Sequence, residues 1–126
     1  MNQGLTLAGR VLLAAIFVVS GFGKLTGAEG FSGFLASLNV PAPLAMAYMV
    51  GAFEMLSGLA IIVGFQTRIV AIALALFCVA TGLLVHLGDQ TALLKNIAMA
   101  GGFLVLAGFG PGSIALDKTA RERRYA

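Results

Sequence analysis

The residue with the clearest chemical potential is Glu54, a carboxylate near the middle of a long run of apolar and small residues, 45–65. A carboxylate in such surroundings can take up and release a proton, as a general acid or base does. Burying its charge is costly unless the charge is paired. We therefore take Glu54 as the candidate catalytic residue. The alternative is a structural glutamate that only joins helices by hydrogen bonds.

Three cations are candidate partners for Glu54. At ~1.5 Å per residue, a helix over 44–65 places Glu54 ~15 Å from the end of the helix at residue 44, which we call its outer end. Lys24 and Lys95 end and begin apolar runs on that outer side, and Arg10 approaches from the other side. The sequence does not rank the three.

Further polar residues lie toward the same outer side. His86 and Asn96 fall close to Lys95 in sequence, and Lys24 lies at a matching height. They predict an outward-facing polar pocket with Glu54 at its floor, and the alternative is a wetted loop that contacts lipid headgroups. The predicted ligand-binding residues are Lys24, His86, Lys95, Asn96 and Arg10.

Composition indicates the kind of fold that positions these residues. The chain of 126 residues is 60% hydrophobic and only 10% charged, and its mean hydropathy is +1.00. A soluble domain of this size needs more polar cover, whereas lipid accepts an apolar exterior. We conclude that the solvent of this chain is a bilayer.

Four apolar runs approach the ~20 residues that a helix needs to cross ~30 Å of hydrocarbon. They cover 5–22, 44–65, 69–87 and 92–109. The predicted fold is all-α, a four-helix transmembrane bundle, with residues 1–126 forming one domain.

The connections predict further structure. Between the first two runs, Phe31, Phe34, Leu35 and Leu38 recur at helical spacing, which predicts a short interfacial helix that ends at 39–43. Between the second and third runs lies a tight turn. There a glycine, at 64, can adopt a left-handed conformation and the threonine at 67 can cap the next helix.

Charge distribution predicts the orientation. Six Lys and Arg residues fall on the side of the termini and two on the other, which places both termini in the cytoplasm. The basic C-terminal residues suit contact with anionic lipid. A basic face on a soluble module is absent, so nucleic-acid binding is not expected.

Several chemistries are excluded by residue counts. The chain has one cysteine, Cys78, and one histidine, His86. These cannot form an intrachain disulfide, a structural zinc site or a bis-histidine haem, so we expect no metal and no intrinsic cofactor. No glycine-rich nucleotide-binding motif is present.

The order and spacing of several short motifs resemble the DoxX family of small four-helix membrane proteins, over nearly the whole chain. The motifs are GRVLL at 9–13, SGFGKL at 20–25, Glu54 with SGLA at 57–60, GFQTR at 64–68, LKNIA at 94–98 with Gly101 and Gly102, and FGPG at 109–112. The resemblance implies a redox-associated protein of the bacterial inner membrane. It also implies soluble oxidoreductase partners.

A quinone or a small oxidant fits that implied role. Quinone carbonyls accept hydrogen bonds, which His86, Lys24, Lys95 and Asn96 can donate, and Glu54 could exchange a proton with the reduced head group. One alternative is a non-catalytic scaffold or partner subunit, in which the charges only fix helix packing. Another is a small-solute transporter.

Small residues spaced four apart favour close helix packing. The pairs are Ala47 with Gly51, Ala71 with Ala75, and Ala98 with Gly102. Such spacing predicts contacts within one chain, and a homo-oligomer is the alternative.

Overall fold

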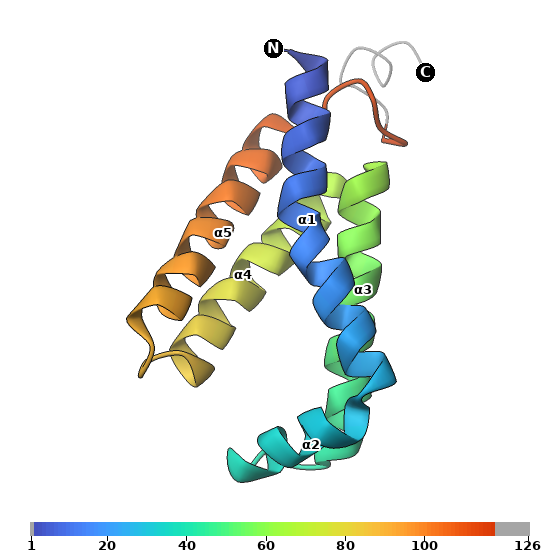
Figure 1. The fold of residues 1–126 in the computed structure, drawn as a ribbon. Coiled ribbons are helices and arrows are strands. Elements are labelled where there is room, and N and C mark those ends of the chain that lie inside the picture. The colour runs from blue at the N-terminus through green and yellow to red at the C-terminus, as the bar shows by residue number, and fades with distance from the viewer. Residues whose placement is uncertain (1, 118–126) are drawn as a thin grey trace. The chain divides into compact units, whose positions relative to one another are not determined.

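The computed structural model describes residues 2–117, which are helical apart from short connections and the segment after residue 109 (Figure 1). In chain order the helices are α1 (Gln3–Thr26), α2 (Ala28–Ser37), α3 (Pro43–Val63), α4 (Thr67–Val85) and α5 (Gln90–Phe109). The predicted all-α fold is thereby confirmed.

Four of these helices, α1, α3, α4 and α5, are long and apolar enough to cross a membrane. Their outward surfaces carry large apolar side chains, such as Leu12 and Leu84, each 78% exposed. Water would not tolerate so many exposed apolar side chains, but lipid does. The four predicted spans are confirmed with small shifts, the largest being that α1 extends through Lys24 to Thr26.

The predicted short helix in the first connection is present as α2. Its buried side chains, Ala28 and Leu35, pack with Ala47 of α3. The helix ends at Ser37, and Asn39 follows with a φ of 62°, which stops helical continuation. The interfacial location of α2, like the cytoplasmic location of the termini, stays a prediction.

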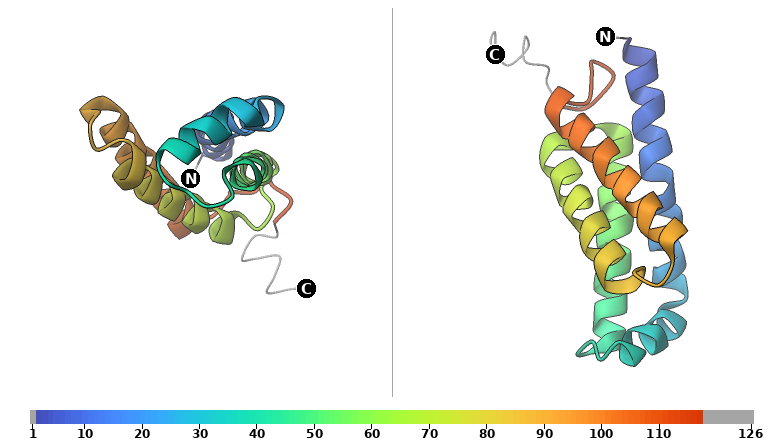
Figure 2. Two further views of the ribbon diagram at one scale, coloured as in Figure 1. Left: turned by 90° about the horizontal axis from the view of Figure 1, so that it is seen from below. Right: turned by 90° about the vertical axis from the view of Figure 1, so that its left-hand side faces the viewer.

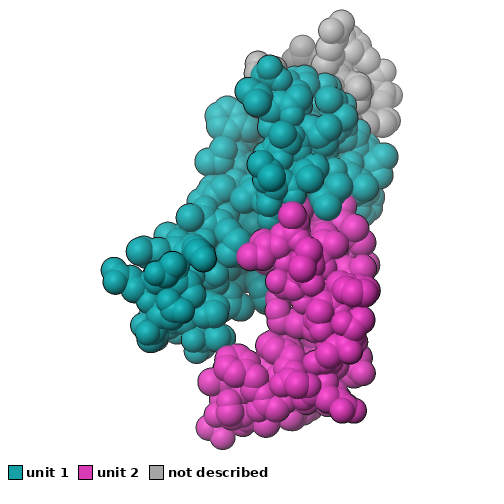
Figure 3. Space-filling model, viewed as in Figure 1, with its two compact units in different colours: residues 1–13, 60–126 teal, residues 14–59 magenta. Residues whose placement is uncertain are grey.

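The described chain divides into two compact units, coloured separately in Figure 3. One contains residues 14–59, and the other contains the chain before residue 14 and from residue 60 onward. Helices α1 and α3 each contribute to both units. A single domain over 1–126 stays a prediction.

In the unit formed by residues 14–59, α1 and α3 run antiparallel with their backbones in close contact. A Cβ atom on Gly21 would lie 2.5 Å from the backbone N of Met55 and 2.7 Å from the carbonyl O of Gly51. Farther along, a Cβ atom on Gly58 would lie 2.8 Å from a methyl carbon of Val18. Only glycine allows this approach, which is how small residues let membrane helices pack.

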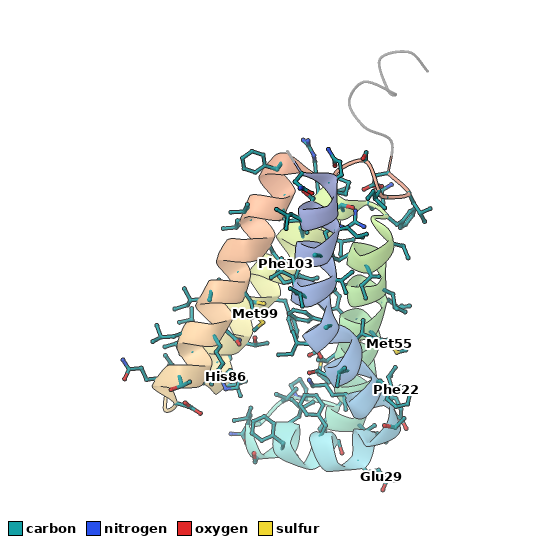
Figure 4. The ribbon with its side chains drawn as sticks, turned by 45° about the horizontal axis from the view of Figure 1, so that its top comes forward. Phe22, Glu29, Met55, His86, Met99 and Phe103 are labelled. Carbon is teal, nitrogen blue, oxygen red and sulfur yellow. The ribbon has the colours of Figure 1, made fainter. Side chains whose placement is uncertain are left out.

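In the other unit, α4 and α5 form an antiparallel pair, side by side in two views (Figure 1, Figure 2). Ala71, Ala75 and Leu74 of α4 are buried, as is Phe103 of α5, which is labelled in Figure 4. Gly102 packs against Leu13 of α1. The predicted packing role of Ala71 and Ala75 is confirmed.

The turn between α3 and α4 agrees with the sequence prediction in one respect and contradicts it in another. Gly64 adopts a left-handed conformation, with φ 74°, and the N–H of Phe65 donates to the carbonyl of Ala60. The prediction that Thr67 caps α4 is wrong, because Thr67 is already the first helical residue. Its own N–H instead donates to the carboxylate of Asp117, which lies far away in the sequence.

We predict that Gly21→Ala destabilises the protein by about 1–3 kcal/mol or more, because the added methyl group would force two backbones apart. A lowered thermal midpoint in detergent would show this. Gly23→Ala is the matched control on the same helix, since its added Cβ meets no described atom within 4 Å beyond its chain neighbours and the nearby backbone of α1. It should be neutral or stabilising. Equal effects of the two substitutions would contradict the close packing.

Candidate functional site

The centre of the candidate site is an ion pair between Lys24 of α1 and Glu54 of α3. The ammonium Nζ donates to both carboxylate oxygens of Glu54, at 3.0 Å to Oε1 and 3.1 Å to Oε2. The Glu54 side chain is 5% exposed and that of Lys24 is 23% exposed. The structure thus pairs Glu54 with one of its three candidate partners, and the lysine is the more accessible member.

The glycine contact between α1 and α3 aligns this pair. Gly21 precedes Lys24 by three residues, and Gly51 precedes Glu54 by three, so each charged residue lies one helical turn from a glycine on the same face. A Cβ atom on Gly51 would lie 3.1 Å from the Cβ of Lys24. The lysine stem therefore passes over the bare backbone at Gly51 to reach Glu54.

An aromatic side chain of α2 completes the surroundings of Lys24. The ammonium group lies 5.0 Å from the ring centroid of Phe31, close enough for a cation–π interaction. Phe31 in turn stacks on Phe34, with centroids 6.2 Å apart and planes inclined at 27°. Sequence reasoning used Phe31 only to place a helix, since helical spacing does not reveal a contact across elements.

Arg10, a predicted ligand-binding residue, is occupied elsewhere. Its guanidinium group donates to two backbone carbonyls, from Nη1 to Pro111 O at 2.7 Å and from Nη2 to Ile62 O at 3.0 Å. The side chain is only 1% exposed. Arg10 therefore joins α1 to the last turn of α3 and to the segment that follows α5.

The remaining predicted ligand-binding residues lie around the α4–α5 connection. Asn96 donates from Nδ2 to the carbonyl of Cys78 at 3.0 Å and to the hydroxyl of Thr81 at 2.9 Å, which ties α5 to α4. His86 follows the last residue of α4 and is half-buried (Figure 4). Lys95 is exposed.

These residues belong to a different compact unit from Lys24 and Glu54. The structure thus brings two of the six predicted site residues into direct contact. The pocket that would add His86, Lys95 and Asn96 to Glu54 stays a prediction.

Chemically, the Lys24–Glu54 pair offers a donor and a proton acceptor within one polar group. An ammonium group has three N–H donors, and two of them are directed to Glu54, which leaves one for a ligand. The carboxylate is shielded and can hold a proton once the lysine turns to another partner.

Four membrane-crossing helices and a buried ion pair define the class as multi-pass helical membrane proteins. Within that class the chain belongs to the DoxX family, whose family model matches residues 5–87. The sequence resemblance is thereby confirmed.

The chain is similar to two Escherichia coli relatives, the inner membrane proteins YphA and YqjF. It is 33% identical to YphA, over 90% of this chain and 89% of the relative. It is 34% identical to YqjF, over 93% of this chain and 92% of the relative. A shorter match, 39% identical over 56% of this chain and 52% of the relative, is to the Bacillus subtilis protein named "Putative oxidoreductase CatD". No solved structure matches the chain significantly.

We predict that Lys24→Met destabilises the protein by about 3–5 kcal/mol, since it leaves a buried carboxylate without its partner. The double variant Lys24→Met/Glu54→Gln should recover most of that loss, because no unpaired charge remains. A double-mutant cycle of thermal or denaturant stability in detergent measures the coupling. Additive effects of the single substitutions would show that the pair contributes nothing.

Proposed function

We propose that the chain is a redox-associated subunit of the bacterial inner membrane that binds a quinone or a similar small oxidant beside Lys24 and Glu54. The observation that carries the proposal is this ion pair, with a shielded carboxylate and a more accessible ammonium group under an aromatic ring. The names of YphA and YqjF support the location, and the name of CatD supports the redox association.

Each group has a defined part in this proposal. The third N–H of Lys24 donates to a carbonyl oxygen of the head group, and Phe31 provides an aromatic surface beside it. As Lys24 turns toward the ligand, the carboxylate of Glu54 takes up a proton from water and passes it to the reduced oxygen, and it repeats this transfer for the second proton. Reduction of a quinone to a quinol takes two electrons and two protons. The electrons would come from a soluble oxidoreductase partner.

A scaffold subunit is the second candidate function, and a specific observation favours it. Both oxygens of Glu54 accept from Lys24, and the two helices that carry the pair are packed backbone to backbone through glycines. Such a pair can fix helix register without any ligand. The proton-exchanging role and the structural role differ in their response to Glu54→Gln, because an amide still accepts a hydrogen bond but does not exchange a proton.

Quinone binding to the full chain in nanodiscs tests the proposal. Wild-type protein should retain quinone on purification and bind added quinone saturably, while Lys24→Met should lose binding. Glu54→Gln should remain folded and lose proton uptake when the bound quinone is reduced. Glu29→Gln is the matched control, since Glu29 is an exposed carboxylate of α2 that points away from its helix (Figure 4).

Other results would change the assignment. Absence of saturable quinone binding in folded wild-type protein would favour the scaffold function. Loss of binding in Lys95→Met as well would extend the site to the α4–α5 connection, as the sequence predicts.

We also propose that both termini face the cytoplasm, which places α2 at the outer surface of the membrane. The support is the excess of Lys and Arg on the terminal side. Fusions at the C-terminus should give fluorescent green fluorescent protein and inactive alkaline phosphatase. A fusion inserted after Asn39, in the connection that follows α2, should give the reverse. Active phosphatase at the C-terminus would overturn the orientation.

A further inference from the structure

The eight residues after α5, 110–117, form a segment that we call the C-terminal strap. It is hydrogen-bonded to three other elements of its unit. The N–H groups of Leu116 and Asp117 donate to the carbonyls of Val63 and Gly64, at 2.9 and 2.8 Å. At its other end the N–H of Ser113 donates to the side-chain oxygen of Gln3. The strap therefore lies against the start of α1 and the α3–α4 turn.

The strap delivers a carboxylate to the N-terminus of α4. Asp117 accepts from the N–H of Gln66 at 2.7 Å and from the N–H of Thr67 at 2.8 Å, one to each oxygen. The N-terminus of a helix carries unpaired N–H donors and a partial positive charge, so it attracts anions. The positive charge of Arg10 also attracts the carboxylate of Asp117.

Within residues 2–117, two buried polar atoms of this region lack partners. The hydroxyl of Thr67, a residue with no exposed surface, has no hydrogen-bond partner there, and neither has Nε of Arg10, which is 1% exposed. A buried polar group without a partner is destabilising, and such groups are rare in native proteins. Each oxygen of the Asp117 carboxylate accepts from one amide, and neither oxygen accepts from the Thr67 hydroxyl. A tetrahedral oxyanion has further oxygens that could accept from the hydroxyl and from the guanidinium group.

We propose that the first turn of α4 and Arg10 form an oxyanion site that binds a phosphate group. When no phosphate is bound, Asp117 occupies this site. The source of the phosphate would be an anionic lipid headgroup or free phosphate. The site lies where three membrane-crossing helices end, α1 and α4 at their N-termini and α3 at its C-terminus, which favours a headgroup. The C-terminal strap then competes with the phosphate group for this site, and dissociation of the strap opens the site to lipid.

Chemical rescue of Asp117→Ala tests this site in the full chain. The variant should lose thermal stability in lipid-free detergent, because two amide donors lose their acceptor. Inorganic phosphate should restore the thermal midpoint saturably, with half-saturation at a concentration roughly tenfold below that of acetate, because phosphate gains the Thr67 hydroxyl as a donor.

Two further variants provide the comparison. Thr67→Val removes the unpartnered hydroxyl at little cost to stability, and in the Asp117→Ala background it should erase the preference for phosphate over acetate. Asp89→Ala is the matched control, because Asp89 caps α5 by accepting from the N–H of Ala92. That variant should lose stability without selective rescue by phosphate.

The source of the phosphate is decided by a lipid arm. Phosphatidylglycerol should stabilise wild-type protein in nanodiscs more than phosphatidylcholine does, and the difference should shrink in Thr67→Val. Rescue by inorganic phosphate together with an absence of this lipid effect would assign the site to a free anion. If Asp117→Ala does not fold, the wild-type and Thr67→Val lipid comparison decides the matter. No rescue in folded Asp117→Ala, or equal lipid effects in wild type and Thr67→Val, would overturn the proposal.

Discussion

Hydrocarbon offers no hydrogen-bond partner to a buried charge, and the arrangement of this protein depends on that constraint. Glu54 is tolerable in the middle of α3 because Lys24 meets both of its oxygens. The lysine can do so only if α1 and α3 approach more closely than ordinary side chains allow. The glycines at their contact permit that approach, so the ion pair depends on the close packing of the two helices.

The same constraint is met differently around Arg10. There the partners are the backbone carbonyl of Ile62 in the last turn of α3, which has no intrahelical donor, and that of Pro111, which lies beyond the end of α5. The C-terminal strap supplies one of these carbonyls and also the carboxylate at the start of α4. A segment without regular structure thus satisfies donors and acceptors that three helices leave open, which explains why it follows a defined path against them.

The Lys24–Glu54 pair also differs from a purely structural ion pair in its surroundings. Phe31 lies over the ammonium group, and the lysine side chain is more exposed than the glutamate. An ion pair with one accessible member can exchange its partner for a ligand, whereas a fully enclosed pair cannot. This asymmetry is why the redox-associated proposal takes precedence over the scaffold, although both use the same contacts.

Some features of the site could be predicted and others could not. Glu54 and Lys24 were identifiable because a charge in an apolar run requires a partner, and the number of candidate cations was small. Their pairing was not, because Lys24, Lys95 and Arg10 lay at compatible depths. Phe31 and Asp117 escaped notice because each acts across elements: one is an ordinary apolar position in a helix, and the other is one of two acids in a basic terminal stretch.

The sequence by itself determined the solvent and the number of long helices, because the length and hydropathy of an apolar run are local properties that lipid selects directly. It also determined the left-handed turn at Gly64, because that conformation is intrinsic to glycine. Tertiary structure alone decided which cation meets Glu54 and that Asp117, rather than Thr67, caps α4. Those outcomes depend on the rotation of the helices about their axes and on the path of the strap. Both are set by contacts between residues far apart in sequence, and the local sequence around each residue does not distinguish one such contact from another.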